Sequence, residues 1–370
     1  MHLRRRQRFM TAGVAAVATA LSLAACSSSS SSSAPSGGST SSAPAGGSSS
    51  SGAALSGTLN GSGSTFQLTF QQAAIQAFKS VQPGMTVNYG GGGSGKGRTD
   101  LSSNVVQFAG SDSTIPAAEE SNFKGKTVLY FPVLLGPISV AYNLSGVSTL
   151  KLTPDVIANI FQGKITSWNN SAITALNPGV TLPSTPISVA VRSDSSGTTQ
   201  NFSLFLEKAA PSTWTLGSSS TIKWPSTARA GNGNGGVAQI VKTTPGAIGY
   251  VDYADAKATG LSSAEVKNKS GNYVAPSTDS ATAAADSTTV APDLTFHAVW
   301  ASGAQAYPIT YQSWVLVYES QSSSNTAKML QAYIGYLLGA GQQLLPGLGY
   351  APLPASLDNM AKAQLSKIGM

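Results

Sequence analysis

The stretch Arg192-Ser193-Asp194-Ser195-Ser196-Gly197-Thr198 follows the apolar run Ile187–Val191 and precedes a predicted helix with its apolar residues in Phe202–Leu206. The quoted residues therefore form a turn from a strand into a helix. The first N–H groups of a helix have no partner inside it, and here they lie beside an arginine, several hydroxyl groups and a glycine. This combination suits an oxyanion. The stretch alone leaves open whether that anion is a substrate, a transition state or a capping side chain.

Three further polar loops follow predicted strands. They are Gly61-Ser62-Gly63-Ser64-Thr65-Phe66 after Leu55–Asn60, Gly90–Gly97 after Met85–Tyr89, and Ser111-Asp112 after Val105–Gly110. Helices are predicted at 67–80 and 99–104, so strands and helices alternate. This alternation indicates a parallel-type α/β sheet, in which ligands bind beyond the carboxyl ends of the strands. All of these loops fall at such ends.

The rest of the chain continues the α/β pattern. Further strands are predicted at Leu129–Leu135, Ile138–Tyr142, Ala247–Val251 and Ile309–Tyr318, and further helices at Thr153–Gly163 and Thr326–Leu338. A loop rich in glycine and asparagine, Gly231–Gly236, leads into another helix. Residues 277–292 are rich in Ala, Ser, Thr and Asp, a composition that leaves helix and loop both open. Residues 55–370 are long for one core, so we expect two domains.

The N-terminus has the pattern of an exported lipoprotein. A basic segment, Arg4-Arg5-Arg6-Gln7-Arg8, precedes a short apolar run that ends at Leu23-Ala24-Ala25-Cys26. This pattern predicts a signal peptide over residues 1–25, too short for a membrane-spanning helix. Cys26 is the only cysteine, and its position resembles that of the lipidated cysteine of a bacterial lipobox. Residues 26–54 are almost entirely Ser, Gly, Ala and Pro, so we expect a flexible tether.

The charge of the chain argues against nucleic acid as a partner. The formal net charge is +7, and removal of the four arginines in residues 1–25 lowers it to +3. Such a small excess provides no basic footprint for a nucleic acid. No later stretch is apolar for long enough to span a bilayer. We therefore expect an exported protein, anchored by its lipid on the outer face of the cytoplasmic membrane.

Catalytic interpretations fit the sequence poorly. Gly90–Lys96 matches most of a nucleotide-binding P-loop, but Gly97 stands where a magnesium-binding Ser or Thr is required. The glycines there are better suited to let backbone N–H groups and a serine approach a bare anion. A serine hydrolase would use Ser196, which lacks the Gly-x-Ser-x-Gly context and, once His2 is removed, has only His297 as a base. Clusters at metal-ligand spacing are absent from the sequence. We expect neither an enzyme nor a bound metal or cofactor.

An anion-binding interpretation draws on all four loops, although each residue has a simpler alternative. Thr65 could cap the following helix, and Ser94 could be a turn residue. Asp112 could cap a following turn, and Arg192 could form a surface ion pair. Their shared position at strand–helix junctions favours a common site. In that site Asp194 would orient the guanidinium group of Arg192.

Several motifs resemble those of the phosphate-binding proteins of Pst-type ABC importers, which have a class II periplasmic-binding-protein fold. The similar loops are Gly61–Phe66, Tyr89–Ser94, Phe108-Ala109-Gly110-Ser111-Asp112 and Val191–Thr198. Similar segments elsewhere are Leu152–Trp168, Ile222-Lys223-Trp224-Pro225 and Pro245–Val251. The resemblance extends from about residue 55 to the C-terminus but matches poorly at 277–304. Lys96 and Arg98 depart from the family pattern.

This resemblance implies an α/β fold with two lobes and a two-strand hinge. Lobe 1 would comprise 55–135 plus 305–370 and lobe 2 would comprise 136–304, with the hinge near Leu135 and Ala304. The implied ligand is inorganic phosphate, with contacts from Thr65, the Phe66 backbone N–H, Ser94, Asp112, Arg192, Ser196, Gly197 and Thr198. Phosphate would close the hinge, and the closed monomer would dock on the importer permease.

The chemistry of Asp112 favours phosphate independently of the resemblance. An ionised carboxylate accepts a hydrogen bond and donates none, and hydrogen phosphate carries a P–OH group that sulfate lacks. Sulfate would leave the carboxylate unpaired beside a dianion, and sites of this kind can discriminate by ~10⁴–10⁵. Two alternatives stay open: a binding protein for another tetrahedral oxyanion, such as sulfate or molybdate, and an exported phosphatase.

Overall fold

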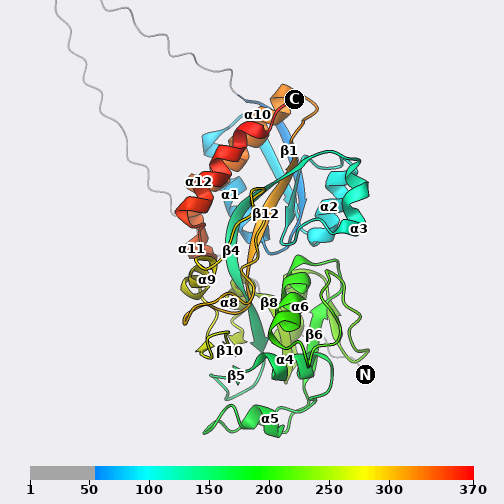
Figure 1. Ribbon diagram of the computed structural model, residues 1–370, viewed down its shortest axis with the longest axis vertical. Helices are drawn as coiled ribbons and strands as arrows, with labels where there is room; N and C mark the ends of the chain where they lie inside the picture. The colour runs from blue at the N-terminus through cyan, green and yellow to red at the C-terminus, as the bar shows by residue number, and fades with distance from the viewer. Residues whose placement is uncertain (1–54) are drawn as a thin grey trace, which may run out of the picture. The chain divides into compact units, whose positions relative to one another are not determined.

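The computed structural model describes residues 55–370 (Figure 1). The predicted signal peptide at 1–25, the predicted lipid-attachment residue Cys26 and the predicted tether at 26–54 lie outside the described residues. Within 55–370, no helix has both the length and the apolar character needed to cross a membrane.

A nine-stranded mixed sheet organises the described residues, in the order β2-β1-β3-β12-β4-β8-β6-β7, with β9 paired to β4. Its strands are β1 (Gly57–Gly63), β2 (Met85–Gly90), β3 (Phe108–Ser111), β4 (Val128–Tyr142), β6 (Ser188–Arg192), β7 (Arg229–Gly231), β8 (Ala247–Asp252), β9 (Ser262–Ser263) and β12 (Thr310–Tyr318). Both flanks are parallel, but β12 runs antiparallel to β3 and β4, and β4 runs antiparallel to β8. The prediction of a parallel-type sheet is thus wrong for the central strands. The chain crosses from one flank to the other along β4 and returns along β12, so these strands pair in an antiparallel direction.

One strand, β4, belongs to both flanks of the sheet. Its residues Val128–Pro137 pair with β12, and Ile138–Tyr142 pair with β8. Figure 1 shows β4 and β12 side by side. The sequence predicts two strands separated by a Gly-Pro pair, whereas the structure has a single strand of 15 residues. Pro137, which lacks an N–H, stands where β4 changes its partner, so the missing hydrogen bond falls at that change.

The remaining elements are helices and a small second sheet. The helices are α1 (Leu68–Val81), α2 (Ser94–Ser102), α3 (Ala117–Glu120), α4 (Pro154–Phe161), α5 (Ser171–Thr174), α6 (Gly197–Ala209), α7 (Gly233–Thr243), α8 (Tyr253–Thr259), α9 (Thr278–Ala285), α10 (Ser324–Leu338), α11 (Leu345–Leu348) and α12 (Ala355–Gln364), with 3₁₀ turns at Ser121–Phe123, Ala340–Leu344 and Leu365–Lys367. The second sheet has the order β11 (Tyr273–Val274), β10 (Glu265–Lys267), β5 (Lys151–Leu152). Helix α9 resolves the open question at 277–292, and a capping box between Ser277 and Ser280 starts it.

Helix α2 begins at Ser94, whereas the sequence predicts a start at Thr99. Its two glycines lower helix propensity and hide the first turn from a pattern-based prediction. Packing requires the second of them: a Cβ on Gly97 would lie 2.7 Å from Gly63 Cα and 2.8 Å from Ser62 O. Helix α2 therefore packs its backbone directly against the end of β1.

Buried aromatic rings hold the loops that follow the strands. Phe66 stacks on Tyr311 with ring centroids 4.1 Å apart and meets Tyr350 edge-on at 5.2 Å. Phe202 of α6 stacks on Tyr250 of β8 at 4.5 Å. Each of these rings is almost wholly buried, and burial of an aromatic side chain stabilises the fold by about 1.5–3 kcal/mol. The first polar loop and the first turns of α6 are thus held by packing as well as by polar contacts.

Candidate anion-binding site

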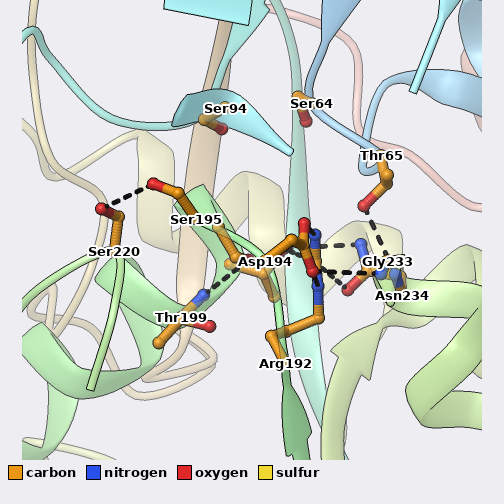
Figure 2. A network of polar contacts seen from close by, with 12 residues as sticks. Ser64, Thr65, Ser94, Arg192, Asp194, Ser195, Thr199, Ser220, Gly233 and Asn234 are labelled. Atoms are coloured by element: carbon orange, nitrogen blue, oxygen red, sulfur yellow. Dashed lines mark hydrogen bonds and ion pairs between the residues drawn. The ribbon is translucent and has the colours of Figure 1, made fainter. Parts of the chain in front are cut away.

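The N-terminus of α6 lies against the loops that follow β2 and β3. A Cβ on Gly197, the first residue of α6, would lie 2.5 Å from Ser94 Oγ and 2.6 Å from Asp112 Cβ. One turn further along α6, Asn201 donates its side-chain N–H to Asp112 O at 2.7 Å. Figure 2 shows that Ser64, Thr65 and Ser94 approach from one side and the Arg192 stretch from the other. The structure therefore brings the predicted loops into one polar cluster.

Asp112 is buried in this cluster, and its carboxylate accepts hydrogen bonds from three hydroxyl groups. Ser64 Oγ donates to Oδ1 at 2.6 Å, Ser313 Oγ donates to the same oxygen, and Ser94 Oγ donates to Oδ2 at 3.2 Å. The Asp112 N–H in turn donates to Ser94 Oγ at 3.1 Å. Because a carboxylate has about four acceptor positions, one further donor can still bind.

Burial is the largest influence on the Asp112 carboxyl, and it raises the pKa above the ordinary 3.8. The hydrogen bonds from Ser313, Ser64 and Ser94 and the positive charge of Arg192 act in the opposite direction and limit that rise in pKa. The ionised form of Asp112 thus depends on the donors around it. A ligand that supplied one more donor would stabilise the ionised form further.

Arg192, the last residue of β6, is fixed by Asp194 and Asn234. Its Nε donates to Asp194 Oδ1 at 2.8 Å, its Nη2 donates to Asp194 Oδ2, and its Nη1 donates to Asn234 Oδ1 at 3.1 Å. Figure 2 shows this group beside Gly233. The bidentate contact sets the plane of the guanidinium group, and Nη1 also lies 3.5 Å from Thr198 Oγ1. Arg192 is thereby presented to the first turn of α6.

The carboxylate of Asp194 is held in its ionised form. Burial pushes its pKa upward, but the hydrogen bond and charge of Arg192, helped by the Gly233 N–H, outweigh burial and lower the pKa. Behind this pair, Asn234 Nδ2 donates to Asp252 Oδ2 at 2.8 Å. Burial, and then the neighbouring charge of Asp255, raise the pKa of Asp252.

The first turn of α6 supplies hydrogen-bond donors to the cluster. Ser196 caps the helix, and its Oγ accepts the Thr199 N–H at 3.1 Å. Gly197 and Thr198 are the first two helical residues, so their N–H groups have no partner four residues earlier in the helix. The Thr198 hydroxyl lies 3.4 Å from the Tyr311 hydroxyl. These groups and Arg192 lie where the helix dipole favours a negative charge.

In the first loop, a central serine joins Asp112 to the backbone. Ser64 is fully buried, and its Oγ accepts the Phe66 N–H at 3.1 Å and the Gln67 N–H at 3.3 Å while donating to Asp112. The Phe66 N–H thus lies beside the Asp112 carboxylate. This arrangement places the end of the first loop at the same cluster.

Thr65 contacts the other side of the cluster. Helix α1 has Gln67 as its N-cap residue, so the alternative that Thr65 caps this helix is wrong. Thr65 Oγ1 instead accepts the Asn234 N–H at 3.3 Å. A hollow of about 420 Å³ borders this contact and is lined by Thr65, Leu68, Thr69, Gly91, Gly92, Asn232, Gly233, Asn234, Gly235 and Asp255. Asn234 therefore both lines the hollow and accepts the hydrogen bond from Arg192.

The glycines of the second loop contact the Arg192–Thr198 stretch directly. The Gly95 N–H donates to Ser195 O at 3.1 Å, and a Cβ on Gly95 would lie 2.1 Å from Ser195 Oγ. A Cβ on Gly93 would lie 2.4 Å from Ser195 O. From the sequence, we expect these glycines to let an anion approach the backbone closely. In the structure, Gly95 instead lets the Ser195 loop approach the backbone closely.

The two cations that follow Ser94 pair with carboxylates outside the cluster. Lys96 is largely exposed, and its Nζ lies 2.6 Å from Asp100 Oδ2. Arg98 is buried and forms a bidentate pair with Glu119, with contacts of 2.6 and 2.9 Å. These contacts account for both charges without the anion.

Several polar residues of the cluster are missing from the predicted set. They are Ser64, Asn201, Asn234, Tyr311 and Ser313. Ser64 and Asn234 lie in the quoted loops Gly61–Phe66 and Gly231–Gly236, so a search of those loops for polar side chains could have found them. Ser313 and Tyr311 lie inside the wholly buried strand β12, where the sequence pattern gives no indication of a polar contact.

The catalytic alternatives gain no geometric support from the described residues. The Ser196 hydroxyl serves as a helix cap, and His297 lies at an exposed position. Among residues 55–370, no group of three His, Cys, Asp or Glu side chains is placed to hold a metal ion.

Comparison with known proteins assigns the chain to a family. A PBP superfamily domain matches residues 48–340. The phosphate-binding protein PstS 3 of Mycobacterium leprae is 35% identical over 312 residues, which cover 82% of this chain and 84% of that protein. The chain belongs to the PstS family of phosphate-binding proteins. Its PstS relative in Pasteurella multocida is 32% identical over 313 residues, covering 83% of this chain and 89% of that protein.

Solved structures support the fold expected of the PstS family. A high-affinity periplasmic phosphate-binding protein with bound phosphate has a TM-score of 0.70 and 22% identity, covering 83% of this chain and 94% of the other. The phosphate-binding protein of Stenotrophomonas maltophilia has a TM-score of 0.68 and 17% identity, covering 83% and 93%. The predicted two-lobed periplasmic-binding-protein fold is confirmed. The lobe boundaries at 135/136 and 304/305 stay a prediction.

Proposed function

We propose that this protein binds inorganic phosphate outside the cytoplasmic membrane and delivers it to the permease of an ABC importer. Its PstS relatives carry the name phosphate-binding protein, and they span most of the chain. The polar cluster around Asp112 and Arg192 supports the same ligand on chemical grounds.

The observation that carries this proposal is the contact between Gly197 and Asp112. It sets the first N–H groups of α6 beside a buried carboxylate that follows β3. Hydrogen phosphate requires both kinds of partner, since its P=O and P–O⁻ oxygens accept hydrogen bonds and its P–OH donates one. Sulfate has no proton to offer Asp112, and molybdate likewise lacks one as a dianion. The acceptor therefore disfavours both alternatives.

The proposed phosphate contacts come from both sides of the cluster. They are Thr65, the Phe66 N–H, Ser94, Asp112, Arg192, Ser196, Gly197 and Thr198, with Asp194 orienting the arginine. Each charge-assisted hydrogen bond contributes about 1.5–3 kcal/mol. Three or four of them suffice for micromolar affinity, near −8 kcal/mol, after the costs of association.

Phosphate would hold two lobes together, 55–135 plus 305–370 and 136–304, about a hinge near Leu135 and Ala304. Three contacts would then form on closure: Gly95 with Ser195, Thr65 with Asn234, and Asp112 with Asn201. All three join a residue of the first proposed lobe to one of the second. The closed form would be the one that docks on the permease.

We also propose that the mature protein is a monomer tethered to the outer face of the cytoplasmic membrane through a lipid on Cys26. The basic and apolar segments that precede this residue in the sequence support export. An enzymatic role is not proposed, because the Ser196 hydroxyl is used as a helix cap and, among residues 55–370, its hydrogen-bond partners include no imidazole or carboxylate.

Isothermal titration of the purified protein with phosphate, sulfate and molybdate tests the proposal. We expect micromolar or tighter binding of phosphate and at least a thousandfold weaker binding of sulfate, on the order that polar sites of this kind achieve. Equal binding of the three anions would contradict the assignment of phosphate. Turnover of a phosphomonoester by the same preparation would instead favour the phosphatase.

A further inference from the structure

Arg98 is a buried cation that contacts both neighbours of Asp112. Its Nη1 donates to Ser113 Oγ at 2.9 Å and to Ser111 Oγ at 3.4 Å. Its Nε and Nη2 donate to the Glu119 carboxylate at 2.6 and 2.9 Å. Every nitrogen of the guanidinium group therefore has a protein partner, and the group is wholly buried. Such a residue supports a neighbouring part of the chain and does not meet a ligand.

The segment that Arg98 contacts is a tight turn around Asp112. Ser111 Oγ donates to Ser113 O at 2.6 Å, and the Ser113 N–H donates to Ser111 Oγ at 3.4 Å. Arg98 bonds the two hydroxyl groups at the same time. The backbone on either side of Asp112 is thus fixed to one guanidinium group, which is in turn fixed by Glu119.

Helix α2 holds the same segment at a second point. Ser94, its first residue, donates to the Asp112 carboxylate at 3.2 Å and accepts the Asp112 N–H at 3.1 Å. Arg98 follows one turn later, and residues four apart are neighbours on a helix surface. One helix face therefore holds both the side chain of Asp112 and the residues beside it.

We propose that Arg98 is a positioning residue that fixes the Asp112 carboxylate and thereby contributes to the choice between phosphate and sulfate. This inference rests on the proposed phosphate-binding function. The donors Arg192, Gly197 and Thr198 suit any tetrahedral oxyanion. An ionised Asp112, in contrast, can accept a hydrogen bond from the ligand but cannot donate one, so it favours an anion that carries a hydroxyl group. A shift of about 1 Å in a positioned group can change its effect a hundredfold. Loss of the Arg98 contacts therefore lowers selectivity more than it lowers the affinity for phosphate.

The test measures phosphate and sulfate affinity by titration calorimetry in the whole purified protein and three variants. Arg98→Gln removes the guanidinium group. The double variant Ser111→Ala, Ser113→Ala removes the two hydroxyl groups that Arg98 contacts but keeps the ion pair with Glu119. Lys96→Gln is the control, because Lys96 is a neighbouring cation on α2 that pairs with Asp100. We expect the ratio of phosphate affinity to sulfate affinity to fall about 10–100-fold in the first two variants and to stay unchanged in the control.

A purely structural role for Arg98 would lower the melting temperature and leave that affinity ratio as in the wild type. Such a result overturns the inference alone, provided that the wild type binds phosphate. A wild type without affinity for phosphate overturns the proposed function and this inference with it. Should Arg98→Gln fail to fold, the double serine variant decides, because it keeps the buried ion pair.

Discussion

The hydroxyl group of Ser313 donates a hydrogen bond to the carboxylate of Asp112 across 201 positions of the sequence. Ser313 belongs to β12, which returns from the C-terminal part of the chain, and Asp112 follows β3. The two strands are antiparallel neighbours in the sheet, with Trp314 opposite Ser111. Asp112, the proposed hydrogen-bond acceptor for the P–OH group of phosphate, therefore depends on a residue from the C-terminal part of the chain.

Replacement of this serine should weaken phosphate binding. Ser313→Ala removes a hydrogen bond that lowers the pKa of Asp112, so we expect a loss of about 1.5–3 kcal/mol in binding, measured by calorimetry. The matched control is Ser139→Ala, because Ser139 is also a buried strand serine, and its hydroxyl has no partner among the described residues. Equal effects of the two changes would speak against a role for Ser313.

Replacement of Asp112 should change the preference among anions. In Asp112→Asn the amide can donate a hydrogen bond to sulfate, so we expect weaker phosphate binding, a smaller preference over sulfate, or both. Competition between the two anions in calorimetry measures this preference. Asp100→Asn is a control outside the cluster, since Asp100 pairs with Lys96. Unchanged selectivity in Asp112→Asn would show that Asp112 does not choose between the two anions.

Loss of Arg192 should weaken binding strongly, because Arg192 is a buried cation that is paired with the Asp194 carboxylate. Arg192→Ala removes a proposed phosphate donor and leaves Asp194 without its cation, so we expect binding to weaken by about 2–5 kcal/mol. Arg192→Lys keeps the charge but not the planar fork, and should recover only part of the loss. Melting curves of both variants separate unfolding from lost binding. Intact affinity in folded Arg192→Ala would exclude the arginine from the site.

A methyl group on Gly95 should oppose the contact between the second loop and Ser195. In Gly95→Ala the Cβ would lie 2.1 Å from Ser195 Oγ, so the two loops must separate. We expect faster phosphate release and a larger radius of gyration in saturating phosphate, measured by stopped flow and X-ray scattering. Gly90→Ala is the control, because a Cβ there meets no atom within 4 Å. Identical release rates in the two variants would contradict this prediction.

The affinity for sulfate should rise as the pH falls. Burial raises the pKa of Asp112 above 3.8, so its carboxyl takes up a proton at a higher pH than an exposed one, and the protonated form can donate to sulfate. The same raised pKa means that the folded state binds more protons than the unfolded state between the two pKa values. Asp112 therefore adds stability as the pH falls through that window. Titration of sulfate at a series of falling pH values measures the effect, and Asp112→Asn should abolish it.

Much of this site could be predicted because its residues lie in short loops after strands. Thr65, Ser94, Asp112 and the Arg192–Thr198 stretch are local features, and glycine and hydroxyl residues mark them in the sequence. The structure brings these loops together as the strand–helix pattern indicates. The antiparallel direction of the central strands could not be predicted from the sequence, because the pairing of β4 with β12 joins segments that are far apart in the chain.

The roles of Ser313 and Arg98 could not be predicted for a different reason. A serine inside a buried strand looks like any other small residue, and only the neighbouring strand decides whether its hydroxyl finds a carboxylate. Arg98 sits in a glycine-containing helix beside the proposed ligand loop, where a cation suggests an anion contact. Its pairing with Glu119 follows from the packing of α2 and α3, which local sequence does not encode.

The length of strand β4 limits where this protein could be cut into fragments or joined to another protein. A single strand of 15 residues supplies backbone partners to both flanks of the sheet, so the chain has no point near Pro137 at which it could be divided into two self-sufficient pieces. A fragment that ended there would leave β3 without β12, and the complementary fragment would hold β12 without its two neighbours, β3 and the first part of β4. Engineers who wish to insert a reporter should therefore choose a surface turn such as the one at Gly179, whose added Cβ would meet no atom within 4 Å.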